Sequence, residues 1–477
     1  MRRTPRLGHP LPSATPAPGS SRSTVAGRLL AHPRRAGRRT RGATATVAAV
    51  LLVVVAAGLT LRLQAIDHPR GNLAADERAY LRLAGDLRMD GTYGDGGLDH
   101  PHHWAPGTPA LFSAAETLGD TPPGDRVPQA PLRAQAVVGT LTVLAAFGVA
   151  ALIGGPVAGL AAATGVALYP PSLQTAWFFV SEPLGGLTLT AATLALLWAW
   201  RRGGPRWIAA GVAFALACLA RADVLLPAVG LLLLAGALLA RRGGLRSAAG
   251  ACVLALAAFA VALAPWTLYA SSRTGSFVPV TDGATSTLLV ATYLPRDSRI
   301  IGLKRAYAAE VRRTHPRLRR TPTWAIPASA VMDVIAAKRP ELGRQAALSA
   351  ELREHVRRYV LGRPLAFAGL EARKLWRMWG GYYHGGHRPI RPAVLWWHRV
   401  LCALALAGLL AGLAATRRAE LGLVLAALLL ATAVGIAFVA EPRHNIRLVP
   451  LLLAGGAAGW ALLVRHRMAT RRSPAGA

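Results

Sequence analysis

Cysteine and lysine are both scarce in this sequence of 477 residues, and the shortage of cysteine argues against a disulfide-rich protein. The three cysteines, Cys218, Cys252 and Cys402, fall inside apolar runs and lack the spacing of metal ligands. We therefore expect no disulfide framework and expect the thiols to pack as small apolar groups. Because lysine occurs only at Lys304, Lys338 and Lys374, arginine supplies nearly all of the positive charge. The formal net charge of the sequence is +33.

Acidic residues are also few, and they are unevenly placed. Residues 1–43 contain none and are rich in Arg, Pro, Ser and Gly, a composition that predicts a disordered basic tail. In a soluble chain so much basic charge would suggest nucleic acid. Here the arginines cluster between apolar runs, which is the pattern of a membrane protein, so no nucleic-acid partner is expected.

Long apolar runs make up much of the remainder, since 53% of the residues are hydrophobic. Runs of about 20 apolar residues cross a bilayer as helices, and the sequence shows no series of short alternating strands that would form a barrel. We expect an all-α, polytopic integral membrane protein with about ten transmembrane helices. The expected spans lie near residues 44–66, 134–154, 156–173, 183–200, 206–220, 224–240, 247–270, 394–416, 421–440 and 446–464.

Arginines in the short loops orient these spans. They fall on the same side as the basic N-terminal tail, which the positive-inside rule assigns to the cytoplasm. The topology leaves Glu420 as the only acid on that side. The basic residues that set the orientation are Arg201, Arg202, Arg206, Arg241, Arg242, Arg246, Arg417, Arg418 and those from Arg465 to Arg472.

Two large loops, 67–133 and 271–393, then face away from the cytoplasm. Residues 44–470 form one transmembrane domain and residues 471–477 a second cytoplasmic tail. We expect the protein in the cell membrane, in contact with the lipid bilayer, with its chemistry on the extracytoplasmic side.

The first outer loop carries the acids best placed for chemistry. Asp76 and Glu77 follow the first span closely, and a carboxylate in a partly desolvated pocket can take the proton of an attacking hydroxyl. A solvated loop carboxylate is the alternative, because this loop is acidic throughout. The tract Asp99–His103 suits a divalent metal, a substrate contact through His102 or His103, or a hydrated surface, and we favour the surface. No other cofactor is expected.

Charged residues also lie at the outer ends of later spans. Glu182 has either a functional role, as a charged residue at the membrane often does, or a structural one. In the structural alternative, its charge interacts favourably with the dipole of the helix that Pro183 starts. Arg221 and Asp223 separate two half-length apolar runs, and they either have a function, as charged residues within a membrane commonly do, or form a local pair. Lys374 in the second loop is a weaker candidate for a contact with substrate.

The segment Glu441–Pro450 contains Arg443, His444 and Arg447 at the outer start of the last span. The guanidinium group of arginine can donate hydrogen bonds to two phosphate oxygens at once. Arginines near a membrane interface can instead extend their charged ends toward water without any such ligand. Arginine on the outer side opposes the positive-inside trend, so we favour a functional role.

The order and placement of these motifs resemble the GT-C glycosyltransferases of family 39, the group of the protein O-mannosyltransferases and lipid A aminoarabinose transferases. The likeness covers about residues 44–290 and the last span. It departs from the family at His444, where tyrosine is common, at the displaced Arg447, and after Pro265-Trp266, where the usual Arg-Asn is missing.

The resemblance implies a GT-C helical bundle in which Asp76 is the catalytic base and Glu77 supports it or binds acceptor. The residues assigned to the donor phosphate are Arg443, Arg447, Arg221 and His444, and those assigned to the substrate lining are Tyr80, Glu182, His102, His103 and Lys374.

The implied reaction is the inverting transfer of a hexose or pentose from a polyprenyl-phosphate-linked donor to a hydroxyl of a glycan, lipid or protein. A lipid or solute transporter, or flippase, is one alternative, but it would need polar groups along a mid-membrane path and usually internal repeats. A cell-envelope glycan polymerase or ligase is another, which would share the donor chemistry but not the Asp-Glu placement.

Overall fold

The computed structural model describes residues 33–67, 73–94, 102–120, 127–382 and 391–472. The chain divides into two units, residues 1–48 and residues 49–477, and the contacts below all lie within the second. Every regular element in the described ranges is a helix, which confirms the all-α expectation. Most of the two predicted tails and Asp99–Pro101 lie outside the described residues.

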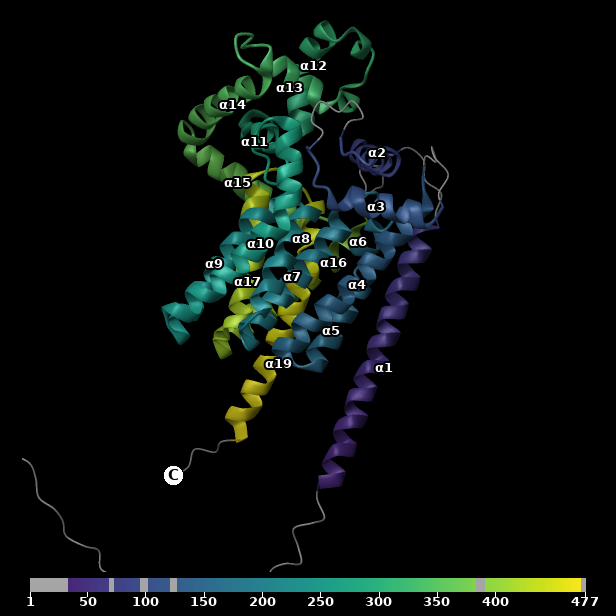
Figure 1. Cartoon of the computed structure of the whole chain (residues 1–477), viewed down its shortest axis with the longest axis vertical. Helices are drawn as coiled ribbons and strands as arrows, with labels where there is room; N and C mark the ends of the chain where they lie inside the picture. Colours follow the sequence, from purple (N-terminus) through teal and green to yellow (C-terminus); the bar gives the residue numbers. More distant parts are fainter. Residues whose placement is uncertain (1–32, 68–72, 95–101, 121–126, 383–390, 473–477) are drawn as a thin grey trace, which may run out of the picture. The chain divides into compact units, whose positions relative to one another are not determined.

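Ten helices correspond to the ten expected spans (Figure 1). They are α1 (Pro33–Ile66), α4 (Gln129–Gly154), α5 (Pro156–Ala167), α7 (Glu182–Arg202), α8 (Arg206–Ala220), α9 (Leu225–Gly243), α10 (Leu245–Thr274), α16 (Pro392–Thr416), α17 (Ala419–Ala437) and α19 (Val449–Arg472). Eight of them are long and apolar enough to cross a membrane, and α5 and α8 are shorter.

Two boundaries differ from the sequence expectation. Helix α1 begins at Pro33, inside the segment 1–43 that was expected to be disordered, because its alanines and arginines favour helix. The expected span 156–173 ends at Ala167, and Pro170 starts a separate helix, α6 (Pro170–Thr175). The first helix stops before the proline because the residue that precedes a proline is disfavoured in helical geometry.

Small residues let the long helices pack closely. Helices α16 and α19 approach so tightly that a Cβ atom on Gly412 would lie 2.4 Å from the Cα of Gly459. In lipid there is no hydrophobic effect between helices, so van der Waals contacts between closely packed backbones hold the helices together.

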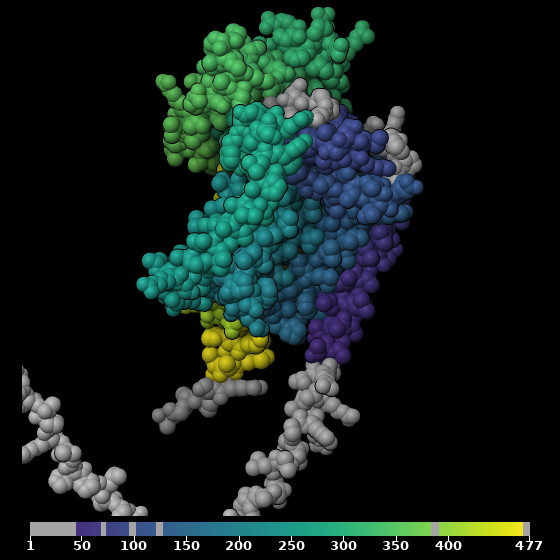
Figure 2. Space-filling view, in the orientation of Figure 1, coloured from purple at the N-terminus to yellow at the C-terminus, as the bar shows by residue number. Residues whose placement is uncertain are grey.

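A second group of helices gathers at one end of the bundle (Figures 1 and 2). They are α2 (Ala75–Asp90), α3 (Gly107–Leu118), α11 (Ala284–Thr292), α12 (Ile300–Thr314), α13 (Ala328–Ala336), α14 (Arg344–His355), α15 (Pro364–Gly380) and α18 (Arg443–Ile446). Helices α11 to α14 share a small core that includes Leu303, Val311 and Val331. The expected outer loops are therefore folded segments. Short links complete the chain as η1 (Ala222–Val224), η2 (Leu294–Arg296), η3 (Pro316–Leu318), η4 (Thr323–Ala325) and the π-helical turn η5 (Val356–Leu361).

Arginines at the ends of several spans lie at the opposite end of the bundle. Arg201 at the end of α7 pairs with Glu420 at the start of α17, with 3.0 Å between Nε and Oε1. Arg465 in α19 donates to the carbonyl oxygen of Gly154 at the end of α4. The one acid that the topology put on the cytoplasmic side thus lies beside the arginines assigned to the same side.

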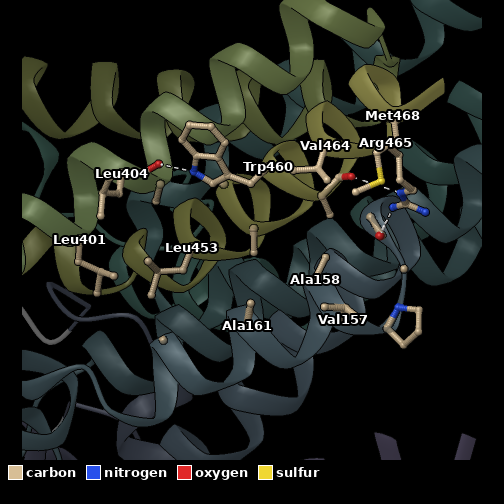
Figure 3. A pocket seen from close by; sticks show the side chains of 18 residues that line it. Val157, Ala158, Ala161, Leu401, Leu404, Leu453, Trp460, Val464, Arg465 and Met468 are labelled. Atoms are coloured by element: carbon tan, nitrogen blue, oxygen red, sulfur yellow. Dashed lines mark hydrogen bonds between the residues drawn. The ribbon is translucent and has the colours of Figure 1, made fainter. Parts of the chain in front are cut away.

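An apolar cavity of about 710 Å³ lies between α5, α16 and α19 (Figure 3). Leu401, Leu453 and Trp460 are among its walls, and Arg465 is the one charged residue that lines it. No carboxylate is among its lining residues, and the charged side chains described below gather at the other end of the bundle.

Candidate active site

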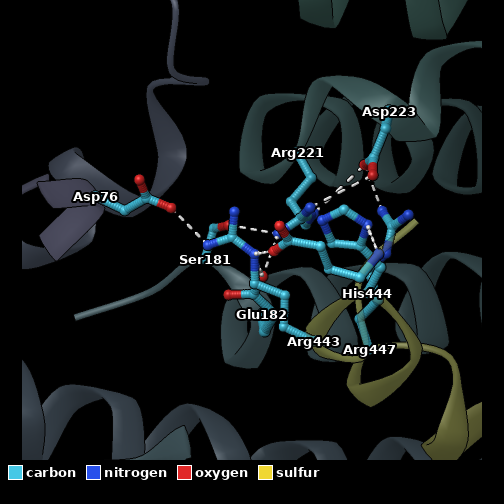
Figure 4. A network of polar contacts seen from close by, with 9 residues as sticks. Asp76, Ser181, Glu182, Arg221, Asp223, Arg443, His444 and Arg447 are labelled. Atoms are coloured by element: carbon cyan, nitrogen blue, oxygen red, sulfur yellow. Dashed lines mark hydrogen bonds and ion pairs between the residues drawn. The ribbon is translucent and has the colours of Figure 1, made fainter. Parts of the chain in front are cut away.

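Charged side chains from four distant parts of the sequence form one network (Figure 4). The network includes Asp76 of α2 and so lies at the end of the bundle that carries this helix. At its edge, Nη1 of Arg443 donates to Oδ2 of Asp76 over 2.5 Å, although 367 positions separate the two residues. Nε of Arg443 lies 3.0 Å from Glu441 and 3.9 Å from Glu182. The side chains of Asp76 and Arg443 are 31% and 24% exposed, so this edge is open to a substrate.

The buried part of the network is centred on Arg221, at the break between α8 and α9. Its Nη1 donates to the Ser181 hydroxyl over 2.6 Å and to Glu182 over 3.0 Å, and its Nε lies 3.4 Å from Asp223. Arg447 donates from Nη1 to the same Asp223. The break in the apolar run therefore serves to bring a cation and an acid into one buried cluster.

Two adjacent glycines on α7 leave room for these arginines. A Cβ on Gly185 would lie 2.6 Å from Cδ of Arg221, and a Cβ on Gly186 would lie 3.5 Å from Cα of Arg447. Only a residue without a side chain leaves Arg221 where it reaches both Ser181 and Glu182.

We expect Gly185→Ala to push Arg221 out of the network. The clash should cost about 1–3 kcal/mol of stability, seen as a lower thermal unfolding midpoint of the purified protein, and should disturb the contact with Glu182. Gly250→Ala in α10 is the matched control, because its added methyl group would meet nothing within 4 Å. Equal behaviour of the two variants would show that the glycine is not needed for the network.

Glu77 holds the chain rather than facing the open edge. Its side chain is buried, Oε2 accepts from the backbone N–H of Ala74, and Oε1 accepts from that of Phe179, each over 2.9 Å. The first contact caps α2 and the second ties α2 to the segment that leads into α7. Glu77 thus fixes the position of its neighbour Asp76.

Aromatic rings form the wall beside Asp76. Tyr80 packs on Trp104 with ring centroids 4.9 Å apart. His102 is fully buried and stacks on Tyr93, while His103 packs edge-on against Trp104. The Pro265-Trp266 motif joins this cluster, since the Trp266 ring lies 4.9 Å from that of Tyr93.

The segment Glu441–Pro450 contains residues of the charge network and a residue that anchors the segment. Asn445 is buried and donates to the carbonyl oxygens of Met378 and Gly381, over 2.6 and 2.9 Å, which holds α18 against the end of α15. Nε and Nη2 of the buried Arg447 have no hydrogen-bond partner, so this guanidinium retains donors for an anion.

The electrostatics of the site favour an ionised carboxylate at Asp76 beside the guanidinium of Arg443. Burial acts to raise the pKa of Asp76, but Arg443 outweighs it, with smaller contributions from His103 and Lys304, so the pKa lies below the usual carboxyl value. Burial and the neighbouring arginines lower the pKa of His444 well below its usual value. His444 is therefore a neutral hydrogen-bonding group and not a cation.

Lys374 does not join the network. Its ammonium group is buried in α15, where it donates to Glu371 over 2.7 Å and to the carbonyl oxygen of Ile436 over 3.0 Å. The second contact ties α15 to α17. Lys304 lies nearer to the site, since its charge acts on Asp76.

Sequence reasoning left two members of the network without a role, namely Glu441 and Ser181. The local pair of Asp223 with Arg221, one of the alternatives considered, is present, but Asp223 also accepts from Arg447. No local pattern indicates that second contact, because the two residues are distant in the sequence. Among the described residues, no three His, Cys, Asp or Glu side chains gather as metal ligands.

No protein-family model and no curated protein sequence matches this chain. Among solved structures it is similar to the oligosaccharyltransferase AglB of Archaeoglobus fulgidus in complex with an inhibitory peptide and a dolichol-phosphate. The TM-score is 0.53 at 14% identity, over 90% of this chain and 52% of AglB. The apo form of the same enzyme gives 0.53 at 15% identity, over 89% and 51% of the two chains.

ArnT from Cupriavidus metallidurans bound to undecaprenyl phosphate is a more distant match, with a TM-score of 0.39 at 16% identity over 90% of this chain and 79% of that one. The chain thus spans about half the length of AglB, and its likeness to AglB concerns the fold alone. That fold is an all-helical bundle of the GT-C type.

Proposed function

We propose that the protein is a membrane glycosyltransferase that moves a sugar from a polyprenyl-phosphate-linked donor to an acceptor hydroxyl. The observation that carries the proposal is the contact of Asp76 with Arg443 at a partly open edge of the charge network. It joins a base and a phosphate-binding cation, the two groups that this transfer needs, at one place.

Asp76 acts as the general base in this scheme. The acceptor hydroxyl attacks the anomeric carbon and gives its proton to the carboxylate as the bond from that carbon to the phosphate oxygen breaks. Attack from the face opposite the phosphate inverts the anomeric centre. Glu77 keeps Asp76 in place through its two backbone contacts.

Arginines stabilise the phosphate as it leaves. Arg443 is the most open of them, and the unpartnered donors of Arg447 lie deeper. Because Arg443 contacts Asp76 in this structure, a donor phosphate has to compete with the carboxylate for the same guanidinium. Binding of the donor therefore frees Asp76 to accept a proton. His444 adds a neutral hydrogen bond.

The sidedness of the reaction follows from the two ends of the bundle. The network lies opposite the end where Arg201 pairs with Glu420 and Arg465 contacts Gly154. The positive-inside rule assigns that basic end to the cytoplasm. The reaction then takes place on the extracytoplasmic face of the cell membrane, where a lipid-linked donor supplies the activated sugar.

Two findings support this over the other functions considered. The AglB structure contains a dolichol-phosphate, so this fold accommodates a lipid phosphate in at least one protein. A transporter needs polar groups along a path through the membrane, whereas the charge network here is gathered at one end. The family-39 resemblance favours transfer of a single hexose or pentose to a glycan, lipid or protein. A glycan polymerase or ligase would use the same donor chemistry.

Incubating the purified chain in nanodiscs with polyprenyl-phosphate sugars and a membrane extract as the acceptor source tests the proposal. We expect free polyprenyl phosphate to accumulate together with labelled product. Nucleotide sugars are the negative control, because the proposed donor carries its activation in the lipid phosphate bond. Movement of the intact lipid across the bilayer without cleavage would instead identify a flippase.

A further inference from the structure

Arg62 is a fully buried arginine in the part of α1 that spans the membrane. Its Nη1 donates to the carbonyl oxygen of Gly58 over 2.9 Å, and its Nη2 donates to the Ser172 hydroxyl over 3.3 Å and to the carbonyl oxygen of Val166 over 3.4 Å. Within the described ranges no carboxylate forms an ion pair with it. A buried charge in a spanning helix is costly, so it indicates a function.

The surrounding helices are shaped around this side chain. A Cβ on Gly139 of α4 would lie 2.6 Å from Nε of Arg62, and a Cβ on Gly58 would lie 3.2 Å from its Nη1. Glycine at position 139 therefore leaves room for a guanidinium that the apolar surroundings do not otherwise favour.

Arg62 also lines a small polar cavity that reaches the charge network. The cavity measures about 10 Å³, which is the room of about one water molecule. Arg62, Gln135, Gly139, Ser172 and Glu182 are among its lining residues, and Glu182 is the one acid that lines it. Nε of Arg62 and Oε1 of Gln135 are buried without a hydrogen-bond partner.

The segment from Ser172 in α6 to Glu182 at the start of α7 connects this cavity to both parts of the site. Ser172 accepts from Arg62, and the carbonyl oxygen of Phe178 accepts from Gln135. The next residue, Phe179, donates to Glu77, which fixes Asp76. At the end of the segment, Glu182 accepts from Arg221.

We propose that Arg62 is a positioning residue of the active site, acting through the polar cavity on Glu182 and on the segment from Ser172 to Glu182. A water molecule in the cavity accepts from Nε of Arg62 and donates to Gln135 and Glu182, which satisfies the unpartnered groups. The guanidinium of Arg62, within the membrane, offsets the negative charge of Glu182. Glu182 therefore stays in place while Arg443 exchanges Asp76 for the donor phosphate. The catalytic part of this proposal rests on the proposed function.

The first test compares Arg62→Gln and Arg62→Lys with Arg133→Gln, a change of an exposed arginine on α4. We expect Arg62→Gln to lower kcat on the order of 10- to 100-fold, because small displacements of catalytic groups have effects of this size. The KM for a soluble acceptor should change less than kcat. Arg62→Lys keeps the charge and should recover part of the loss, whereas Arg133→Gln should match the unmodified protein.

A double-mutant cycle with Gly139→Ala separates positioning from general damage. The added methyl group should displace Arg62 and lower kcat in the unmodified protein. It should cost little in an Arg62→Ala background, where the guanidinium that it would strike is gone. Non-additive effects of this kind indicate coupling of the two positions. Gly250→Ala is the control for an added methyl group in open space.

Hydrogen exchange provides a readout that needs no enzymatic activity. Arg62→Gln should speed amide exchange in residues 172–182, and above all at Phe179, whose N–H is bonded to Glu77. If exchange rises but the unmodified chain transfers no sugar, the proposed function fails and the structural link stands. Unchanged exchange and unchanged kcat in Arg62→Gln, or strictly additive effects with Gly139→Ala, would overturn the inference.

Discussion

Asp76→Asn should lower the rate of sugar transfer by about 10²- to 10⁴-fold, the range that removal of a general base typically costs. The amide keeps the shape of the side chain but cannot take a proton. Binding of polyprenyl phosphate should persist, because the arginines that hold the phosphate are unchanged. Turnover with a labelled donor and equilibrium binding of polyprenyl phosphate, both in nanodiscs, measure the two quantities separately.

Asp297→Asn is the matched control, since Asp297 is 62% exposed and pairs with Arg373 away from the network. Exposed pairs of this kind contribute little. Retention of most activity by Asp76→Asn would mean that Asp76 is an ordinary loop carboxylate and that another group takes the proton.

The pH dependence follows from the same ion pair. A carboxylate base works when ionised, that is, above its pKa, and Arg443 holds the pKa of Asp76 below the usual value. The pH profile of kcat/KM reports the pKa values of the free enzyme. Its acidic limb should therefore lie at a pH below about 4, the ordinary pKa of an aspartate. In Arg443→Ala the limb should move to higher pH, because burial then acts on Asp76 without its main counter-charge.

Arg443→Ala should weaken binding of the donor and also lower turnover, by about 10²- to 10³-fold. The substitution removes the most open cation of the network and leaves Asp76 and Glu441 without their shared partner. Arg443→Lys should recover only part of both losses, because a point charge cannot pair two phosphate oxygens as a guanidinium does.

Arg373→Ala removes an exposed arginine of α15, away from the network, so it controls for the loss of positive charge alone. If Arg443→Ala bound polyprenyl phosphate and turned over normally, the cluster would be an interfacial anchor. The search for a phosphate ligand would then move to Arg221 and Arg447.

The sequence sufficed for the fold class because its signals are strong and local. Apolar runs mark the helices, and α4, α7, α10 and α16 begin and end within a few residues of the expected positions. The boundaries that differ depend on finer effects. Pro170 ends the third span early, and alanine and arginine extend α1 toward the N-terminus.

The site was harder to predict because its partners are distant in the sequence. Charge and position were enough to single out Asp76, Arg221 and Arg443, but no pattern pairs residues 367 positions apart. Arg62 was missed for a related reason. It stands at the end of an apolar run, where a snorkelling arginine is ordinary, and only the packed helices reveal that it is buried.

A density map of the protein with polyprenyl phosphate bound tests the central claim most directly. The account predicts the phosphate within hydrogen-bonding distance of Arg443, near Arg447, with Asp76 released from Arg443 and facing the space where the sugar would lie. A phosphate at the other end of the bundle, for example beside Arg465 at the apolar cavity, with the contact of Asp76 and Arg443 intact, would contradict it.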